Sequence, residues 1–361
     1  MKWPTLTLWF LLSISPSALV SAQQPERYTL DAGAAAIYNL VGNVRVESGS
    51  GAVTVQVTRV GGDMAKLRIG QGAMDGRSTL RVTYPADRIR SGNLRSHGST
   101  QLRVRDDGTF GDQDWQAHGR KEHHHWEEEG RRVTITDDSE GLDARADLVV
   151  GVPKGANVSL YLAVGSVTVS NVDGELRVDS HSAPITASGT RGTLEVDVGA
   201  GDVRIAQAQG EVHVDTGSGT VDVTGFHGSS LSIDTGSGDV TGSDFETDDL
   251  SVDTGSGEVR ISGVASPSVS LETGSGGITA ELRRDVSSLS VETGSGDIAI
   301  HAPATLGAEV EIETSSGDIE TDFPLLVTRQ SRDHMVGTVG DGKGTIAIET
   351  GSGGIKLLKS N

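Results

Sequence analysis

The chain of 361 residues contains no cysteine, and aromatic residues make up only 4 % of it. Without cysteine, neither a disulfide framework nor a lipid-modified N-terminal cysteine can form. Stability outside the cytoplasm therefore has to come from packing and hydrogen bonding. Because so few large rings are available, the core has to be built from aliphatic side chains.

Long hydrophobic runs are also missing, except at the N-terminus. Residues 1–22 begin with Lys2, continue through an apolar run and end in Val20-Ser21-Ala22. This pattern predicts a secretory signal peptide cleaved after Ala22. An uncleaved membrane anchor is the alternative, but the apolar run is shorter than the roughly 20 residues that span a bilayer. We therefore expect an exported protein, periplasmic or on the cell surface, with no transmembrane segment in the mature chain.

Basic residues are outnumbered, since 30 Lys and Arg stand against 50 Asp and Glu, a net charge of −20. Such an acidic surface repels nucleic acid and anionic lipid, and it favours cations or basic partners. We expect no nucleic-acid partner. Glycine, in contrast, is abundant with 49 residues, which indicates many turns.

The main feature present in the chain is a repeat. The letters DTGSG occur at 215–219, 234–238 and 253–257, and related copies flank them. The aligned acids recur at steps of 18 to 21 residues, with a last copy at Glu349 and an isolated early copy at Glu47. The regular series comprises Asp179, Asp197, Asp215, Asp234, Asp253, Glu272, Glu292 and Glu313. A period of this length indicates a stack of similar supersecondary units.

Each unit alternates apolar residues with period two on both sides of a Gly-Ser-Gly corner. In LSVDTGSGEVRI, Leu250, Val252 and Thr254 share one parity, whereas Val259 and Ile261 have the other. Two short strands with one buried side therefore meet at a corner where glycine supplies the bend. One unit cannot bury its own apolar side, so units are expected to stack about 4.8 Å apart. We predict an all-β fold, a right-handed parallel β-helix (β-solenoid) with coils of about 18–21 residues.

Two aliphatic rows are expected to fill the solenoid, stacked in chain order. The first row comprises Leu176, Leu194, Val212, Leu231, Leu250, Val269, Leu289, Val310 and Ile346. The second row comprises Val203, Val221, Val240, Val259, Ile278, Ile298, Ile319 and Ile355.

The chain divides into four parts. After the signal peptide, residues 23–85 carry the first strands or solenoid coils, and residues 132–361 form the repeat domain. Residues 86–131 between them are rich in charge, Gly and His. We expect a long hairpin or a mobile insertion there.

Several stretches together resemble a known family. They are DLVVGVPKGANVSLYLAVGSVTV at 147–169, the coils DTGSGDV and ETGSGDI, and the ending FPLLVTRQ…GTVGDGKGTIAIETGSGGIKL from Phe323. This pattern resembles the bacterial putative-adhesin family, exported domains of unknown function with parallel β-helical folds, over roughly 30–85 and 132–361. The resemblance implies an envelope role linked to stress response, and it supplies no catalytic residues.

The letters DTGS also look like the catalytic signature of a pepsin-like aspartic protease. Such an enzyme needs two aspartates facing each other across one cleft. Here the acids recur in every unit, and Asp253 lies between the inward residues Val252 and Thr254. We therefore expect an outward row of carboxylates rather than a catalytic pair.

This row has two interpretations. The simpler one is a solvated acidic face, and the other is a weak Ca²⁺-binding ladder along Asp215, Asp234, Asp253 and Glu272. The repeat lacks the nine-residue spacing of calcium-binding β-rolls. The Thr and Ser of each TGSG are expected to point inward and to hydrogen-bond from coil to coil.

The insertion holds the remaining candidate sites. His123, His124 and His125 are dense in metal-capable side chains but match no zinc signature, so an exposed run or adventitious metal binding is expected. Trp115 and Trp126 are the candidate partner-binding residues, because Trp is enriched in interaction hot spots.

A polysaccharide lyase or hydrolase on a β-helix is the main alternative to a non-enzymatic protein. Between residues 165 and 321, however, Phe226 and Phe245 are the only aromatics and lysine is absent. Acids recur equally in every coil, so no unique glycosidase pair stands out. We expect no catalytic residues and no cofactor. The prediction is a non-enzymatic envelope protein, adhesin-like or a scaffold, whose partner is an envelope protein or a glycan.

Overall fold

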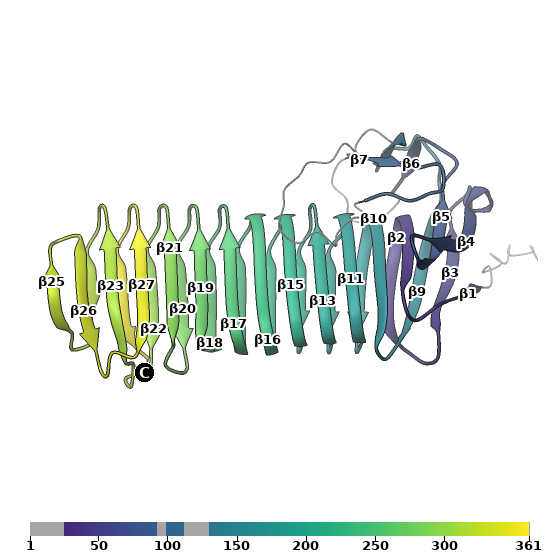
Figure 1. Cartoon of the computed structure of the whole chain (residues 1–361). Helices are drawn as coiled ribbons and strands as arrows, with labels where there is room; N and C mark the ends of the chain where they lie inside the picture. The colour runs from purple at the N-terminus through teal and green to yellow at the C-terminus, as the bar shows by residue number, and fades with distance from the viewer. Residues whose placement is uncertain (1–24, 92–98, 112–129, 361) are drawn as a thin grey trace, which may run out of the picture.

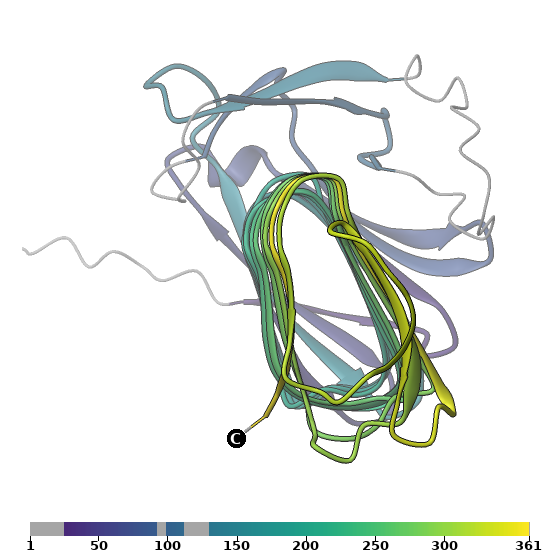
Figure 2. The same ribbon diagram turned by 90° about the vertical axis from the view of Figure 1, so that its left-hand side faces the viewer.

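The computed structural model describes residues 25–91, 99–111 and 130–360. They form a long stack of β-strands with a short 3₁₀ helix, η1 (Met64–Lys66). Figure 1 shows the strands side by side along a rod, with the N-terminal part at one end. Seen end on, the coils superpose as a flattened oval with two long sides (Figure 2). The predicted all-β parallel solenoid is confirmed.

Four long strands bend at a corner and contribute to both sides of the oval. They are β2 (Ala35–Gly49), β10 (Ala156–Ser170), β16 (Val221–Ser237) and β17 (Val240–Thr254). The first side also contains β5 (Arg77–Thr83), β11 (Asp173–Ser182), β13 (Arg191–Val198), β15 (Gln209–Ser218), β19 (Ser268–Thr273), β21 (Ser288–Thr293), β23 (Ala308–Thr314) and β27 (Gly344–Thr350). The second side also contains β9 (Arg145–Pro153), β12 (Ile185–Ser188), β14 (Val203–Ala206), β18 (Val259–Ala265), β20 (Ile278–Leu282), β22 (Ile298–Ala302), β24 (Ile319–Thr321) and β28 (Ile355–Lys359).

Antiparallel strands complete the sheet at each end of the rod. At the N-terminal end these are β1 (Glu26–Leu30), β3 (Val53–Val60) and β4 (Arg68–Met74). At the C-terminal end they are β25 (Leu326–Gln330) and β26 (His334–Val339).

The core is the aliphatic column that the alternation predicts. Every member of the first predicted row is at most 3 % exposed, and the second row is buried except for Ile319, which is partly buried. Phe226 and Phe245 stack in register in the same column, and both are fully buried. Stacking of the coils therefore removes one continuous apolar surface from water. This burial is the main stabilising contribution in a solenoid.

The order of the last coils differs from the predicted chain order. Leu289 of β21 pairs with Ile346 of β27, and Ile346 pairs in turn with Val310 of β23. The final coil of the chain therefore lies between two coils that precede it. The reason is that β26 folds back antiparallel on the outer edge of β23, which leaves the inner edge to β27. The periodic alternation is the same in all copies, so it cannot distinguish these orders.

A comparable rearrangement occurs at the N-terminal end. The second half of β2 pairs in parallel with both β9 and β10, so it lies between two strands that follow it by about a hundred residues. Both ends of the rod are thus tied by long-range strand pairing.

The insertion contributes a separate three-stranded sheet. It consists of β6 (Arg88–Arg90), β7 (Ser99–Val104) and β8 (Arg131–Thr136). The strand β8 begins at Arg131, the last residue of the predicted insertion, so this sheet extends past the boundary drawn from the sequence, and the solenoid resumes with β9. Figure 1 shows this sheet beside the N-terminal end of the rod.

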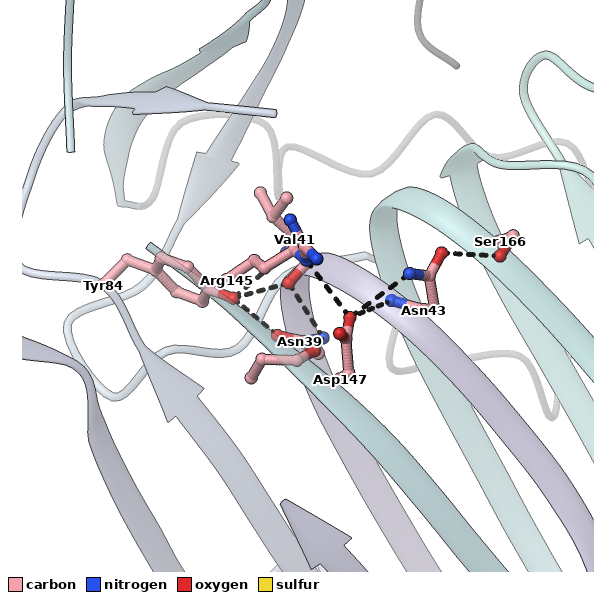
Figure 3. A network of polar contacts seen from close by, with 8 residues as sticks. Asn39, Val41, Asn43, Tyr84, Arg145, Asp147 and Ser166 are labelled. Carbon is pink, nitrogen blue, oxygen red and sulfur yellow. Dashed lines mark hydrogen bonds and ion pairs between the residues drawn. The ribbon is translucent and has the colours of Figure 1, made fainter. Parts of the chain in front are cut away.

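A polar network, buried around Tyr84 and Asn39 and exposed around Asn43, connects the bend in β2 with Tyr84 just before the insertion and with the start of β9 (Figure 3). The Tyr84 hydroxyl donates to Asn39 Oδ1 at 2.8 Å, and Asn39 Nδ2 donates to the Ala146 carbonyl at 2.8 Å. Asp147 Oδ1 accepts the Asn43 backbone N–H at 2.9 Å. Burial raises the pKa of Tyr84, so this hydroxyl keeps its proton and stays a donor.

Candidate functional site

The predicted row of acids exists and is continuous along the first side of the rod. We call it the acid ladder. Parallel pairing places each acid directly beside the next one, from Asp179 at the N-terminal end to Glu313 at the other. In stacking order it comprises Asp179, Asp197, Asp215, Asp234, Asp253, Glu272, Glu292, Glu349 and Glu313.

The ladder carboxylates point outward, and like charges repel at Asp253 and Glu272, whereas Asp179 at the N-terminal end forms an ion pair with Arg177 at 3.9 Å. Asp234, Asp253 and Glu272 are exposed, whereas Asp215 is half-buried. Partial burial, and then the charge of Asp234, raises the pKa of Asp253. The charge of Asp253 is the largest cause of the raised pKa of Glu272. A row of like charges about 4.8 Å apart is therefore a surface on which a cation or a basic group relieves repulsion.

Aromatic residues continue the ladder at its N-terminal end. Tyr161 pairs with Asp179, and Tyr38 pairs with Tyr161. The two tyrosine rings stack with centroids 4.4 Å apart and planes at 3°. Phe110 of the insertion packs edge-on against Tyr38 at 6.0 Å, and both tyrosines are buried. Burial, followed by the neighbouring Tyr161, raises the pKa of Tyr38.

Sequence reasoning missed this aromatic end of the ladder, although a signal existed. Counting one period of 18 residues back from Asp179 reaches Tyr161. The isolated early copy at Glu47 gives no such signal, because Glu47 pairs with Ser170 on the other side of the oval. Its ESGSG letters therefore lie outside the ladder.

The threonines that follow the ladder acids point inward as predicted, and all are at most 1 % exposed. Four of the predicted hydroxyls, those of Thr254, Thr273, Thr293 and Thr314, bond from coil to coil, and the acceptor is a glycine carbonyl. Thr216 Oγ1 instead donates to the Ser218 carbonyl of its own corner, and the Thr235 hydroxyl has no partner. Thr293 Oγ1 donates to the Gly276 carbonyl at 3.0 Å, and Thr273 Oγ1 donates to that of Gly257 at 3.2 Å. The predicted inward threonines are Thr216, Thr235, Thr254, Thr273, Thr293 and Thr314.

The serines of the TGSG corners do not point inward, contrary to the prediction. Ser237, Ser256 and Ser295 are exposed. The chain already turns at the glycine after the threonine, so the alternation ends before it reaches the serine. The corner thus presents its serine hydroxyl to solvent beside the acid ladder.

Other predicted site residues lie outside the described residues. These are His123, His124 and His125, together with Trp115 and Trp126. The predicted signal peptide, residues 1–22, also lies outside them. In the described ranges, no group of three or more His, Asp or Glu is arranged to hold a metal ion, and the low-affinity cation ladder stays a prediction.

A hollow lies at a corner of the rod. Its volume is about 410 Å³, and Glu246, Asp248, Arg284 and Asp285 line it. Gly228, Thr247, Ser266 and Pro267 complete the lining without any aromatic platform. The Ser266 hydroxyl donates to its neighbour, the Ser268 carbonyl, at 2.7 Å. It is therefore already engaged in the corner's own hydrogen bonding.

Comparison with known proteins gives one family match. The model of the family described as Toastrack DUF4097 matches residues 112–358. No curated protein matches the sequence. The part of the chain that the structure describes holds no helix with the length and apolarity of a membrane-spanning one.

Two solved structures were also found. One is described as a putative adhesin from Parabacteroides distasonis, with 10 % identity, a TM-score of 0.41, and coverage of 93 % of this chain and 96 % of that one. The other is described as a putative cell adhesion protein from Clostridium sporogenes, with 10 % identity, a TM-score of 0.22, and coverage of 93 % and 100 %.

Proposed function

This chain belongs to the Toastrack DUF4097 family, and from that premise we propose that it is a non-enzymatic, exported protein of the cell envelope. Its role is adhesin-like or that of a scaffold. The rod presents the acid ladder to an envelope protein or a glycan, and basic groups on that partner contact several carboxylates at once.

The observation that carries this proposal is the sameness of the coils. From Asp215 to Glu349 each coil offers the same outward acid beside the same corner. Catalysis needs a few groups of different kinds converging on one reacting atom. An extended row of identical groups instead suits additive binding of an extended partner, in which affinity grows with the number of contacts.

The finer parts of the proposal rest on the sequence. The signal peptide supports export to the periplasm or cell surface, the family resemblance supports a link to envelope stress response, and the handedness rule for parallel crossovers supports a right-handed coil.

Weak calcium binding is a second proposal, and the raised pKa values of Asp253 and Glu272 favour it. A cation seated between these carboxylates would remove the repulsion that raises them. We expect millimolar calcium to raise the melting temperature relative to chelator, and this increase to vanish in Asp253→Asn/Glu272→Gln. An identical melting temperature in both conditions would exclude the proposal.

The main experiment compares binding with cleavage in the same samples. The mature protein is incubated with a panel of bacterial polysaccharides and with isolated cell envelopes, and both co-sedimentation and release of reducing ends are measured. We expect co-sedimentation with the envelopes or with at least one polysaccharide, and no reducing ends.

Two triple variants give the control. Asp234→Asn/Asp253→Asn/Glu272→Gln neutralises three neighbouring ladder acids and should weaken co-sedimentation. Asp248→Asn/Glu281→Gln/Asp318→Asn neutralises three exposed acids off the ladder and should leave it unchanged. Release of reducing ends that one ladder substitution abolishes would show an enzyme instead.

A further inference from the structure

The C-terminal tip of the rod ends in a strand with one unpaired edge. The strand β25 pairs with β26 in antiparallel fashion, and this is its only strand partner in the described chain. Figure 1 shows β25 as the outermost strand at the end opposite the insertion. Its outer edge therefore offers backbone N–H and C=O groups that another strand can pair with.

The side chains of β25 are exposed along its whole length. All five residues are solvent-exposed, and Leu326 and Val327 are 75 % and 45 % exposed. They are the two large hydrophobic residues that stand out to solvent in the described parts of the chain. Leu325, just before the strand, packs partly against the core. The edge thus combines free backbone groups with apolar side chains.

The strand β25 and the residues directly around it are basic, in contrast to the rod. Residues 157–361 contain 31 Asp and Glu against 11 Lys and Arg. The stretch 325–332, LLVTRQSR, contains Arg329 and Arg332 and no acid, and Asp333 follows it beside Arg332. Both arginines are exposed, and neither makes an ion pair with a described residue. A second copy would bring its own Arg329 and Arg332 to the same edge, and these like charges disfavour self-pairing.

We propose that the free edge of β25 binds an extended acidic segment of a partner protein by strand addition. The partner's backbone pairs with the edge, its carboxylates face Arg329 and Arg332, and its apolar side chains cover Leu326 and Val327. Backbone pairing gives affinity in such complexes, and the alternate side chains give specificity. This surface is separate from the acid ladder, so the inference does not depend on the proposed function.

The test uses the full mature protein and fluorescence anisotropy of short labelled peptides. The probe alternates Glu and Val, a second peptide alternates Lys and Val, and a third is the Glu–Val peptide with N-methylated backbone amides. We expect the Glu–Val peptide to bind and the other two to bind about tenfold more weakly or not at all. N-methylation keeps the charges but removes the backbone donors, so it separates strand addition from a charge contact.

The matched variants are Arg329→Glu at the edge and Arg68→Glu in β4 at the N-terminal end of the rod, two exposed arginines with the same charge change. Binding should fall about tenfold in the first and stay unchanged in the second, with both variants melting as the parent does. Equal binding by the N-methylated peptide, or equal loss in both variants, would overturn the proposal. So would an Arg329-dependent dimer in sedimentation equilibrium, because the edge would then pair with a second copy.

Discussion

At the scale of single residues, the residues of the repeated DTGSG motif have four different structural roles. The acid is an outward rung of the ladder, the threonine is an inward donor, the serine faces solvent, and the glycines form the corner. Each role follows from the position of the residue in its coil, because strand pairing places copies directly over one another. A motif that resembles catalytic chemistry in isolation therefore forms a repeated coil corner here.

The inward threonines allow a matched test of hydrogen bonding in the core. Thr293→Val removes the bond to the Gly276 carbonyl and should lower the stability by about 1 kcal/mol. Thr235 is equally buried, but its hydroxyl lacks a hydrogen-bond partner. Thr235→Val should therefore be neutral or stabilising. Denaturant midpoints of the two variants check this, and an equal loss in both would mean that the hydroxyl bond contributes nothing.

We predict that the contribution of the acid ladder to the stability of the folded protein decreases as the pH rises through the carboxyl range. Because the pKa values of Asp253 and Glu272 are raised, the folded state keeps these protons to higher pH than the unfolded chain. Their contribution to stability is thus full below the ordinary carboxyl pKa and is lost as pH rises through the raised values.

Asp253→Asn removes one of these charges. We expect it to stabilise the protein by about 0.5 kcal/mol at pH 7, a magnitude typical of exposed charge pairs, and to make no difference at pH 3. Thermal melts at both pH values measure this, with Asp318→Asn as the control. A lower melting temperature at pH 7 for Asp253→Asn alone would contradict the repulsion account.

At the scale of elements, the corner between two strands depends on close approach between coils. Gly257 has φ +151°, and a Cβ on it would lie 2.1 Å from the Gly238 carbonyl oxygen of the neighbouring coil. Gly51 also has positive φ, +79°, but a Cβ there meets nothing within 4 Å. A substitution at Gly51 therefore introduces backbone strain alone, whereas a substitution at Gly257 introduces a clash with the neighbouring coil as well.

Gly257→Ala should therefore destabilise far more than Gly51→Ala. We expect a loss of about 3 kcal/mol or more for the first and about 1 kcal/mol for the second, which carries only the strain of the left-handed backbone. Unfolding midpoints followed by circular dichroism compare them. Similar losses would show that the contact between coils is not tight at the corner.

The strands and the corners were predictable because their signals are local. Alternation of Leu250 and Val252 marks the buried side, and the two glycines of each TGSG mark the bend. The position of the serines was not predictable from parity alone, because parity continues in the sequence after the chain has turned. The aromatic end of the ladder was missed because Tyr161 has a different side chain from the acids with which it is in register.

At the scale of the whole molecule, the stacking order could not be derived from the repeat. Copies with the same alternation fit beside one another in any order, and only the connections decide between them. The hairpin of β26 on β23 moves the final coil inward, so that Glu349 lies between Glu292 and Glu313. The ladder and the core are continuous only because this coil fills the gap.

Engineered disulfides test this continuity most directly, since the chain has no cysteine of its own. Ser290 of β21 lies beside Ala347 of β27, and Ala347 lies beside Glu311 of β23. Neighbouring parallel strands are about 4.8 Å apart, so Ser290 and Ala347 are close enough for a disulfide. Ser290 and Glu311 are separated by two such spacings, and a disulfide cannot join Cα atoms more than about 7 Å apart. We predict that Ser290→Cys/Ala347→Cys forms a disulfide within the native protein and that Ser290→Cys/Glu311→Cys does not, as seen by mass spectrometry of the oxidised proteins. A disulfide in the second pair and none in the first would contradict the inserted coil.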